Sequence, residues 1–242
     1  MTGHISEQHA REEICRVGRS LFERGYVHAT AGNISVRLDD AQGGGFLITP
    51  TDACLGFLEP QRLARLDAQG VQVSGDKASK TIALHTRIYE ATRALGANTR
   101  CVIHTHSTHC VALSLRHASA ASHTPAQAVQ AAQMELLDAI TPYFVMKVGH
   151  VPLMPYHRPG DPLLAQQVAD TIARYGQQGI TLRAVMLARL GPNVWHDSPA
   201  SAMAVLEELE ETARLVCMAS GPLTPLTPSD IEDLRHTFGA HW

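Results

Sequence analysis

Hydrophobic positions recur along the chain at helical and strand spacings in turn. A first helix is predicted over residues 6–24, because Ile14, Val17 and Leu21 recur at intervals of three and four residues. Ser6 is a suitable N-cap for this helix, since its hydroxyl can accept a hydrogen bond from the first free backbone N–H groups.

Strand signals follow the first helix. Two strands are predicted over residues 30–38 and 45–49, which are rich in apolar and β-branched residues, with residues 39–44 as the turn of a hairpin. A short strand is expected at residues 70–74. The remaining pattern predicts helices over residues 80–95, 125–140, 162–175 and 199–219, and strands over residues 101–106, 143–148 and 184–188. This order indicates a mixed α/β fold with a central sheet packed by helices.

The chain is expected to form a single domain over residues 1–242, because no Gly/Ser-rich or charge-rich linker interrupts it. Its C-terminal tail, residues 222–242, begins with a proline-rich connector that favours an extended conformation. A last short helix follows, with Ser229 or Asp230 as its cap, and the tail could pack on a neighbouring subunit.

Composition narrows the range of functions. The formal net charge is -3, and Lys and Arg are scattered, so no nucleic-acid or membrane-surface partner is expected. The N-terminal residues lack the apolar core of a signal peptide, and no run of about 18 apolar residues occurs, so we expect a cytoplasmic protein. The five cysteines include no Cys-x-x-Cys pair and are expected to be reduced.

The most informative motif is His104-Thr-His106, at the end of an apolar run. Side chains alternate faces along a strand, so both imidazoles are expected on one side, about 6–7 Å apart along the backbone. This arrangement suits two ligands of one metal ion, although two buried rings paired with backbone groups would have the same spacing. A catalytic site for a divalent ion also needs a third ligand, which spacing alone does not identify.

Several segments together resemble the class II aldolase and adducin family. They are residues 30–37 (Thr-Ala-Gly-Asn-Ile-Ser-Val-Arg), 48–52 (Ile-Thr-Pro-Thr-Asp), 77–80 (Lys-Ala-Ser-Lys), 102–110 and 191–192 (Gly-Pro). Within the family, residues 143–162 look most like the branch that decarboxylates 3-oxo-tetronate 4-phosphates, and the L-fuculose-phosphate aldolases are more distant. The resemblance implies a three-layer α/β/α fold with a mixed, mainly antiparallel sheet. It also implies a homotetramer with active sites between subunits and a divalent metal, most often zinc.

The resemblance also assigns roles to individual residues. His104 and His106 fall at metal ligands, and Tyr143 falls at a tyrosine that protonates an enediolate from an adjoining subunit. The positions that such enzymes use to bind the substrate phosphate and neighbouring oxygens are Gly32, Asn33, Thr51, Asp52, Ser79 and Lys80. Backbone N–H groups, short hydroxyls and one cation are the groups that phosphate requires, which agrees with this assignment.

Two positions depart from the family pattern. Relatives carry a glutamate where this chain has Thr81, and a histidine that completes the metal site where it has Leu190. His109, His196 or a group from the next subunit would have to replace that ligand, or Arg189 could supply a cation instead. Two hypotheses follow. The protein is a metal-dependent lyase for a phosphorylated keto-sugar acid or sugar phosphate, or it is a non-catalytic ligand-binding or scaffold member of the family.

Overall fold

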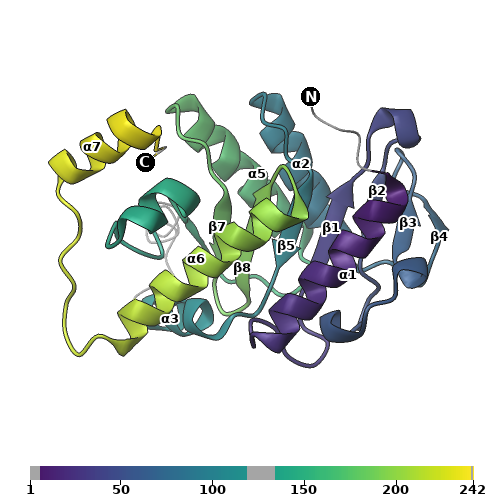
Figure 1. The fold of residues 1–242 in the computed structure, drawn as a ribbon, viewed down its shortest axis with the longest axis horizontal. Helices are drawn as coiled ribbons and strands as arrows, with labels where there is room; N and C mark the ends of the chain where they lie inside the picture. The colour runs from purple at the N-terminus through teal and green to yellow at the C-terminus, as the bar shows by residue number, and fades with distance from the viewer. Residues whose placement is uncertain (1–5, 119–133, 241) are drawn as a thin grey trace.

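An eight-stranded sheet forms the centre of the computed structural model, which describes residues 6–118, 134–240 and 242 (Figure 1). The strand order is β4-β3-β2-β1-β5-β8-β7-β6, and every neighbouring pair is antiparallel except β6 with β7. The strands are β1 (Asn33–Arg37), β2 (Phe46–Ile48), β3 (Ala64–Leu66), β4 (Gln72–Ser74), β5 (Cys101–His104), β6 (Leu153–Met154), β7 (Ala184–Leu187) and β8 (Gly191–His196). The expected mixed, mainly antiparallel sheet is therefore confirmed.

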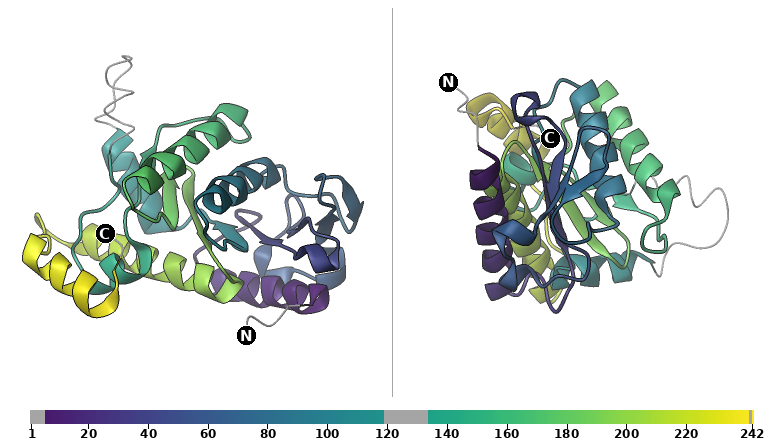
Figure 2. Two further views of the ribbon diagram at one scale, coloured as in Figure 1. Left: turned by 90° about the horizontal axis from the view of Figure 1, so that it is seen from above. Right: turned by 90° about the vertical axis from the view of Figure 1, so that its right-hand side faces the viewer.

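Helices cover both faces of the sheet, which confirms the three-layer architecture (Figure 2). One face is covered by α1 (Glu7–Glu23) and α6 (Pro199–Met218), and the other by α2 (Ile82–Ala94) and α5 (Pro162–Gln177). The other helical segments are α3 (Thr108–Ala118), α7 (Pro228–Phe238), η1 (Asp40–Gln42), η2 (Leu55–Phe57), η3 (Pro60–Arg62) and η4 (Phe144–Val148). Across the described ranges, no helix combines the length and apolarity that a bilayer-spanning segment requires.

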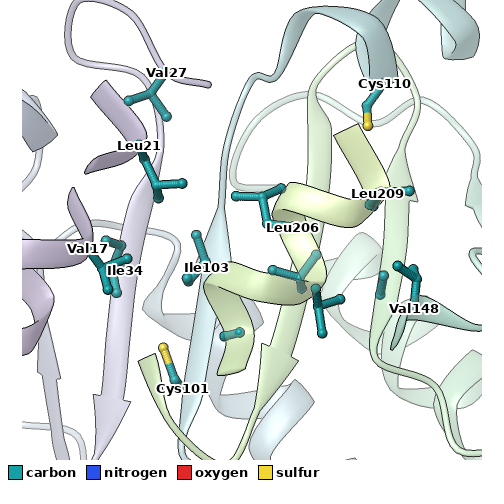
Figure 3. Close-up of a cluster of buried hydrophobic side chains, with 14 of the residues drawn as sticks. Val17, Leu21, Val27, Ile34, Cys101, Ile103, Cys110, Val148, Leu206 and Leu209 are labelled. Atoms are coloured by element: carbon teal, nitrogen blue, oxygen red, sulfur yellow. The ribbon is translucent and has the colours of Figure 1, made fainter. Parts of the chain in front are cut away.

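Alternation along the central strand β5 divides the core between the two faces. Ile103 is fully buried with Leu206 and Leu209 of α6 on one side (Figure 3), whereas Val102 packs with residues of α2 and α5 on the other. Each fully buried aliphatic side chain of this kind contributes about 1.5–3 kcal/mol by leaving water. The same alternation directs His104, two residues after Val102, towards α2 and α5.

Helix-capping signals were accurate guides to the helix ends. Ser6 and Ser198 cap α1 and α6, where each hydroxyl accepts a hydrogen bond from a backbone N–H group of the first turn. The cap of α7 differs from the expectation, because Thr227 occupies the N-cap and Asp230 completes a capping box three residues later. Pro228 therefore takes the first helical position, where its missing N–H costs nothing.

The strand expected over residues 143–148 is wrong, because this segment forms the π-helical turn η4. The N–H group of Gly149 donates to the oxygen of Phe144, five residues earlier, at 2.9 Å, which closes the wide turn. The Thr141 hydroxyl accepts from the Phe144 N–H at 3.1 Å and starts the turn. A mainly apolar run of six residues is too short for periodicity to separate a strand from a helical turn.

The helix expected over residues 125–140 is wrong in its described part, and residues 125–133 lie outside the described ranges. Residues 134–140 form no helix, and their backbone is hydrogen-bonded to residues 151–153, at the start of β6. The Leu136 N–H donates to Val151 at 2.9 Å, and the Leu153 N–H donates to Met134 at 2.8 Å. These long-range backbone bonds override the local helical preference.

Candidate active site

A cavity of about 280 Å³ opens between the sheet and the N-terminal ends of α2 and α5. The fold brings together eight of the predicted site residues here, from four separate segments of the chain. They are Gly32, Asn33, Thr51, Asp52, Ser79, Lys80, His104 and His106. A larger cavity, of about 460 Å³, lies at the opposite ends of α2 and α5 and contains none of them.

Three residues on adjacent strands form the floor of the smaller cavity. Asn33 of β1 pairs with His104 of β5, and His104 pairs with Asn193 of β8, so the three side chains share the face covered by α2 and α5. All three are buried, and the side-chain oxygens of both asparagines have no hydrogen-bond partner among the described residues. Asn193 was not predicted from the sequence, and its signal is an amide between Pro192 and Val194 within β8.

His104 is held as a neutral imidazole with a free nitrogen lone pair. Its Nδ1 lies 3.0 Å from the backbone oxygen of Pro192, and a carbonyl oxygen only accepts, so Nδ1 carries the hydrogen. Burial lowers the pKa of His104 to about 4, and the neighbouring His106 ring adds to the effect, although the Pro192 hydrogen bond opposes it. At neutral pH, Nε2 is therefore unprotonated, as a metal ligand must be.

His106 lies beyond the end of β5, so the expected strand geometry holds only for the first histidine of the pair. Even so, the ring centroids of His104 and His106 are 5.0 Å apart in an edge-on arrangement. The ring of His28, in the turn after α1, lies edge-on to His106 with 6.4 Å between centroids. Burial lowers the pKa of His106, and His28 adds to this effect. Three imidazoles thus follow one another from the buried floor to the exposed surface.

A chain of hydrogen bonds fixes the buried side chain of His85 in α2. The hydroxyl of Tyr89 donates to the backbone oxygen of Ser35 at 3.0 Å, the Ser35 hydroxyl donates to Tyr89 at 2.8 Å, and Nδ1 of His85 donates to the Ser35 hydroxyl at 2.7 Å. Nε2 of His85 therefore has a lone pair, and it is buried with no partner in the described part of the chain. Burial, with a smaller effect from His104, lowers the pKa of His85 to about 3.

Two residues with left-handed backbone conformations shape one wall of the cavity. Gly32 has a φ of 85°, and a Cβ atom there would lie 2.8 Å from the backbone oxygen of His104. Glycine is therefore required for this close approach to β5. Asp52 has a φ of 56° and is exposed, so its conformation favours glycine or asparagine, and its carboxylate can turn into solvent.

The opposite wall carries hydroxyls and a cation at the start of α2. Ser79 is buried with its hydroxyl 2.9 Å from that of Thr81, and Lys80 between them is exposed. The N–H of Thr51 donates to the oxygen of Lys77 at 2.8 Å, which holds the two loops together. A helix N-terminus flanked by hydroxyls and a lysine is a suitable site for an anion.

Comparison with known proteins identifies the family. The family model described as "Class II Aldolase and Adducin N-terminal domain" matches residues 12–217. The chain belongs to the class II aldolase and adducin family. A 3-oxo-tetronate 4-phosphate decarboxylase of Cupriavidus necator is 48% identical over 242 residues, which cover 98% of this chain and 99% of the relative.

Solved structures agree with this assignment to the class II aldolase and adducin family. YgbL of Escherichia coli is 38% identical, with a TM-score of 0.78 over 95% of this chain and 99% of that chain. An L-fuculose 1-phosphate aldolase is 22% identical, with a TM-score of 0.74 over 98% of this chain and 99% of that chain, and it supports the fold alone.

Both departures from the class II aldolase pattern lie at the cavity. Thr81 and Leu190 line it, and Leu190 also packs against the apolar cluster between the sheet, α2 and α5. Arg189 is exposed and does not line the cavity, so the structure does not support the hypothesis that its guanidinium replaces the metal's charge.

Of the replacement ligands considered, His109 and His196 are engaged elsewhere. His109 lies on α3, where its Nδ1 is 2.8 Å from a carboxylate oxygen of Glu210 of α6. His196 pairs with Cys101 at the far end of β8, and its Nδ1 is 2.8 Å from the carboxylate of Asp197. Neither side chain lines the cavity.

The donor chemistry of His104 and His106 fits one shared divalent ion. An ion bound tetrahedrally at about 2.0–2.1 Å by two imidazole nitrogens holds the ring centres about 5 Å apart, and the observed separation is 5.0 Å. Catalytic zinc sites use three protein ligands. Within the described ranges, no three His, Cys, Asp or Glu side chains are placed to hold one ion. The pair therefore fits the metal but lacks a third protein ligand in position.

Tyr143 does not line the cavity of its own chain. It is 60% exposed at the start of η4, whereas the next residue, Phe144, is fully buried. The Phe144 ring packs edge-on against Trp242, with 5.7 Å between centroids. The η4 turn is therefore held by the packing of Phe144, and the Tyr143 side chain is exposed to solvent.

Proposed function

We propose that the protein is a lyase that decarboxylates a 3-oxo sugar acid phosphate through an enediolate, or cleaves a sugar phosphate through the same intermediate. The main support for this proposal is the cavity, which is lined by eight predicted site residues from four segments of the chain. The Cupriavidus necator relative supports the decarboxylation. That relative is named as a 3-oxo-tetronate 4-phosphate decarboxylase and is 48% identical over nearly the whole of both chains.

The substrate phosphate would bind between the loop at Gly32 and the start of α2. Thr51, Ser79 and Lys80 would supply hydroxyls and a cation, with the helix N-terminus adding backbone N–H groups. Asp52 would contribute its backbone N–H rather than its carboxylate, because a carboxylate beside the phosphate would repel it.

The reaction would break the bond between the carboxylate carbon and the carbon next to the ketone. The electron pair of that bond moves onto the ketone to give an enediolate, CO2 leaves, and a proton is then delivered to carbon. For a 3-oxo-tetronate 4-phosphate the product is dihydroxyacetone phosphate. A divalent ion held by His104 and His106, with zinc as the first candidate, would supply Lewis-acid stabilisation of the enediolate charge.

The proton donor would be Tyr143, and it would come from an adjoining subunit of a homotetramer. Its exposure and its position outside its own cavity support a role at another chain. A phenol hydroxyl is a suitable proton donor to a basic carbanion. The cytoplasmic location expected from the sequence stays a prediction.

The second candidate is a non-catalytic ligand-binding or scaffold role. Thr81 and Leu190 favour it, because they place a hydroxyl and an alkyl group where family members carry a carboxylate and an imidazole. This protein would bind phosphorylated sugars without turnover.

The deciding experiment is turnover of a synthetic 3-oxo-tetronate 4-phosphate by the purified protein, followed by CO2 release and enzymatic detection of dihydroxyacetone phosphate. The protein would be tested after chelation and after reloading with zinc, manganese, cobalt or nickel. Metal-restored turnover supports the lyase. Tight binding of the substrate with no turnover in any of these ions would instead support the scaffold role.

A further inference from the structure

The histidine pair His104 and His106 lacks a third metal ligand at position 190, where the family pattern would supply one. Leu190 lines the cavity with an alkyl side chain, and His109 and His196 are paired with carboxylates elsewhere. Nε2 of His85 has a free lone pair, but the ring is completely buried outside the cavity lining and fixed through Nδ1 by the Ser35 hydroxyl, so it has no room to turn into the cavity. Asn193 is also completely buried, with its side-chain amide at His104. A replacement from the same chain would have to be another imidazole close to His106.

His28 lies next to His106, just outside the residues that line the cavity. Its ring centroid is 6.4 Å from that of His106, and the two rings meet edge-on. Co-ligation requires about 5 Å between ring centres, so the His28 ring has to move by roughly 1–2 Å. The residue is exposed, and no described side chain or backbone group hydrogen-bonds its ring, so rotation about its side-chain bonds is unobstructed by any existing pairing.

The backbone beneath His28 is fixed, in contrast to its side chain. Val27 is buried, and the carbonyl of His28 accepts a hydrogen bond from the Ala31 N–H at 2.9 Å. Ala29 has a φ of 49°, a left-handed conformation that costs a non-glycine residue about 1–2 kcal/mol. Backbone strain of this kind persists only where the surrounding structure holds it, and it concentrates at functional sites.

We propose that His28 is the third protein ligand of a divalent ion held by His104 and His106, in place of the missing histidine at position 190. The inference rests on the proposed function for the ion itself. It changes the origin of the third ligand, which would come from the turn between α1 and β1 instead of the turn between β7 and β8. Three neutral imidazoles would leave one open position for substrate, as in other catalytic zinc sites.

The test is metal affinity, measured without turnover. Purified full-length protein would be stripped with chelator and titrated with zinc against a competing indicator, and with Co²⁺ while its visible d–d absorption is recorded. His28→Gln is expected to weaken zinc binding by more than about 100-fold, since even groups that only support a ligand cost about 10- to 100-fold. The matched control is His9→Gln, an exposed histidine near the opposite end of α1, which should bind as wild type does.

A second variant provides a rescue. Adding Leu190→His to His28→Gln should recover zinc affinity and the Co²⁺ spectrum, because it returns an imidazole to the cavity wall. If His28→Gln binds zinc as tightly as wild type, the proposal for His28 is overturned, but the metal-dependent function stands. If wild-type protein binds no ion at all, both the role of His28 and the metal dependence of the lyase are overturned.

Discussion

The Nδ1 hydrogen of His104 points at the backbone oxygen of Pro192, 3.0 Å away, and this contact decides which ring nitrogen faces the cavity. We predict that metal-free protein contains His104 as the Nδ1–H tautomer and that this ring stays neutral until the pH approaches about 4. ¹⁵N spectra of protein labelled at histidine would show one protonated and one unprotonated ring nitrogen at pH 7. Assignment by loss of the signal in His104→Gln is the control, and a doubly protonated ring at pH 6 would contradict the prediction.

Lys80→Met is expected to raise the KM for a phosphorylated substrate by about 10- to 100-fold, with a smaller change in kcat. The lysine is the charged group expected to hold the phosphate, and a charge-assisted hydrogen bond contributes about 1.5–3 kcal/mol. Lys77→Met is the matched control, because Lys77 is equally exposed three residues earlier and does not line the cavity. Equal effects of the two variants on KM would indicate a general loss of charge rather than a phosphate contact.

Tyr143→Phe should lower kcat by about 10²- to 10⁴-fold, the usual contribution of a positioned proton donor, and leave KM and thermal stability almost unchanged. The tyrosine is 60% exposed, so its hydroxyl does not support the core. Tyr156→Phe, at a tyrosine that is 58% exposed, is the control and should retain activity.

Mixing experiments test whether Tyr143 acts across subunits. Tyr143→Phe and His104→Ala proteins, each inactive alone, should recover part of the activity after they are dissociated and reassembled together. Some sites would then combine His104 of one chain with Tyr143 of another. Absence of recovery, with mixed oligomers demonstrated by mass spectrometry, would place Tyr143 at its own chain's site or outside catalysis.

His85 should make the folded state sensitive to acid. Its pKa is about 3 in the folded protein and near 6.5 when unfolded. Below pH 6.5 the unfolded chain therefore takes up a proton that the folded chain does not, and stability falls as pH falls. The loss is about 1.4 kcal/mol per pH unit, or about 2 kcal/mol between pH 7 and pH 5. Urea unfolding at both pH values should show this loss in wild type.

The comparison variant is His85→Asn, which keeps an N–H donor for the Ser35 hydroxyl but does not titrate. We expect it to be less stable than wild type at pH 7 and to lose about 2 kcal/mol less on going to pH 5. His104 contributes equally to both proteins, so it cancels in the difference. Parallel stability profiles for the two proteins would contradict the assignment of a neutral His85.

Elements with a local physical signal were predictable from the sequence. The α1 and α6 helices have capping serines and apolar residues at helical spacing, and β1 and β2 are β-branched segments near glycines. The residues of the cavity were predicted from their resemblance to a family, and the fold brings them to one place. Periodicity could not have supplied this result, because the segments are far apart in the chain.

The features that were missed depend on contacts distant in sequence. The η4 turn is set by the hydrogen bond from Gly149 to Phe144 and by packing of Phe144 against Trp242, and neither contact produces a periodic pattern in residues 143–148. His28 becomes relevant only because the turn after α1 meets the end of β5. Asn193 matters because register places it opposite His104, and register is a property of the assembled sheet.

The turn at residues 188–191, which carries Leu190 at the cavity, is held in a constrained backbone conformation. Arg189 has a φ of 68°, and a Cβ atom on Gly191 would lie 1.9 Å from the oxygen of Thr105, so the turn has little freedom to drift. A histidine introduced at position 190 would therefore meet a backbone that is already fixed, and its imidazole would enter the cavity wall without remodelling of the turn.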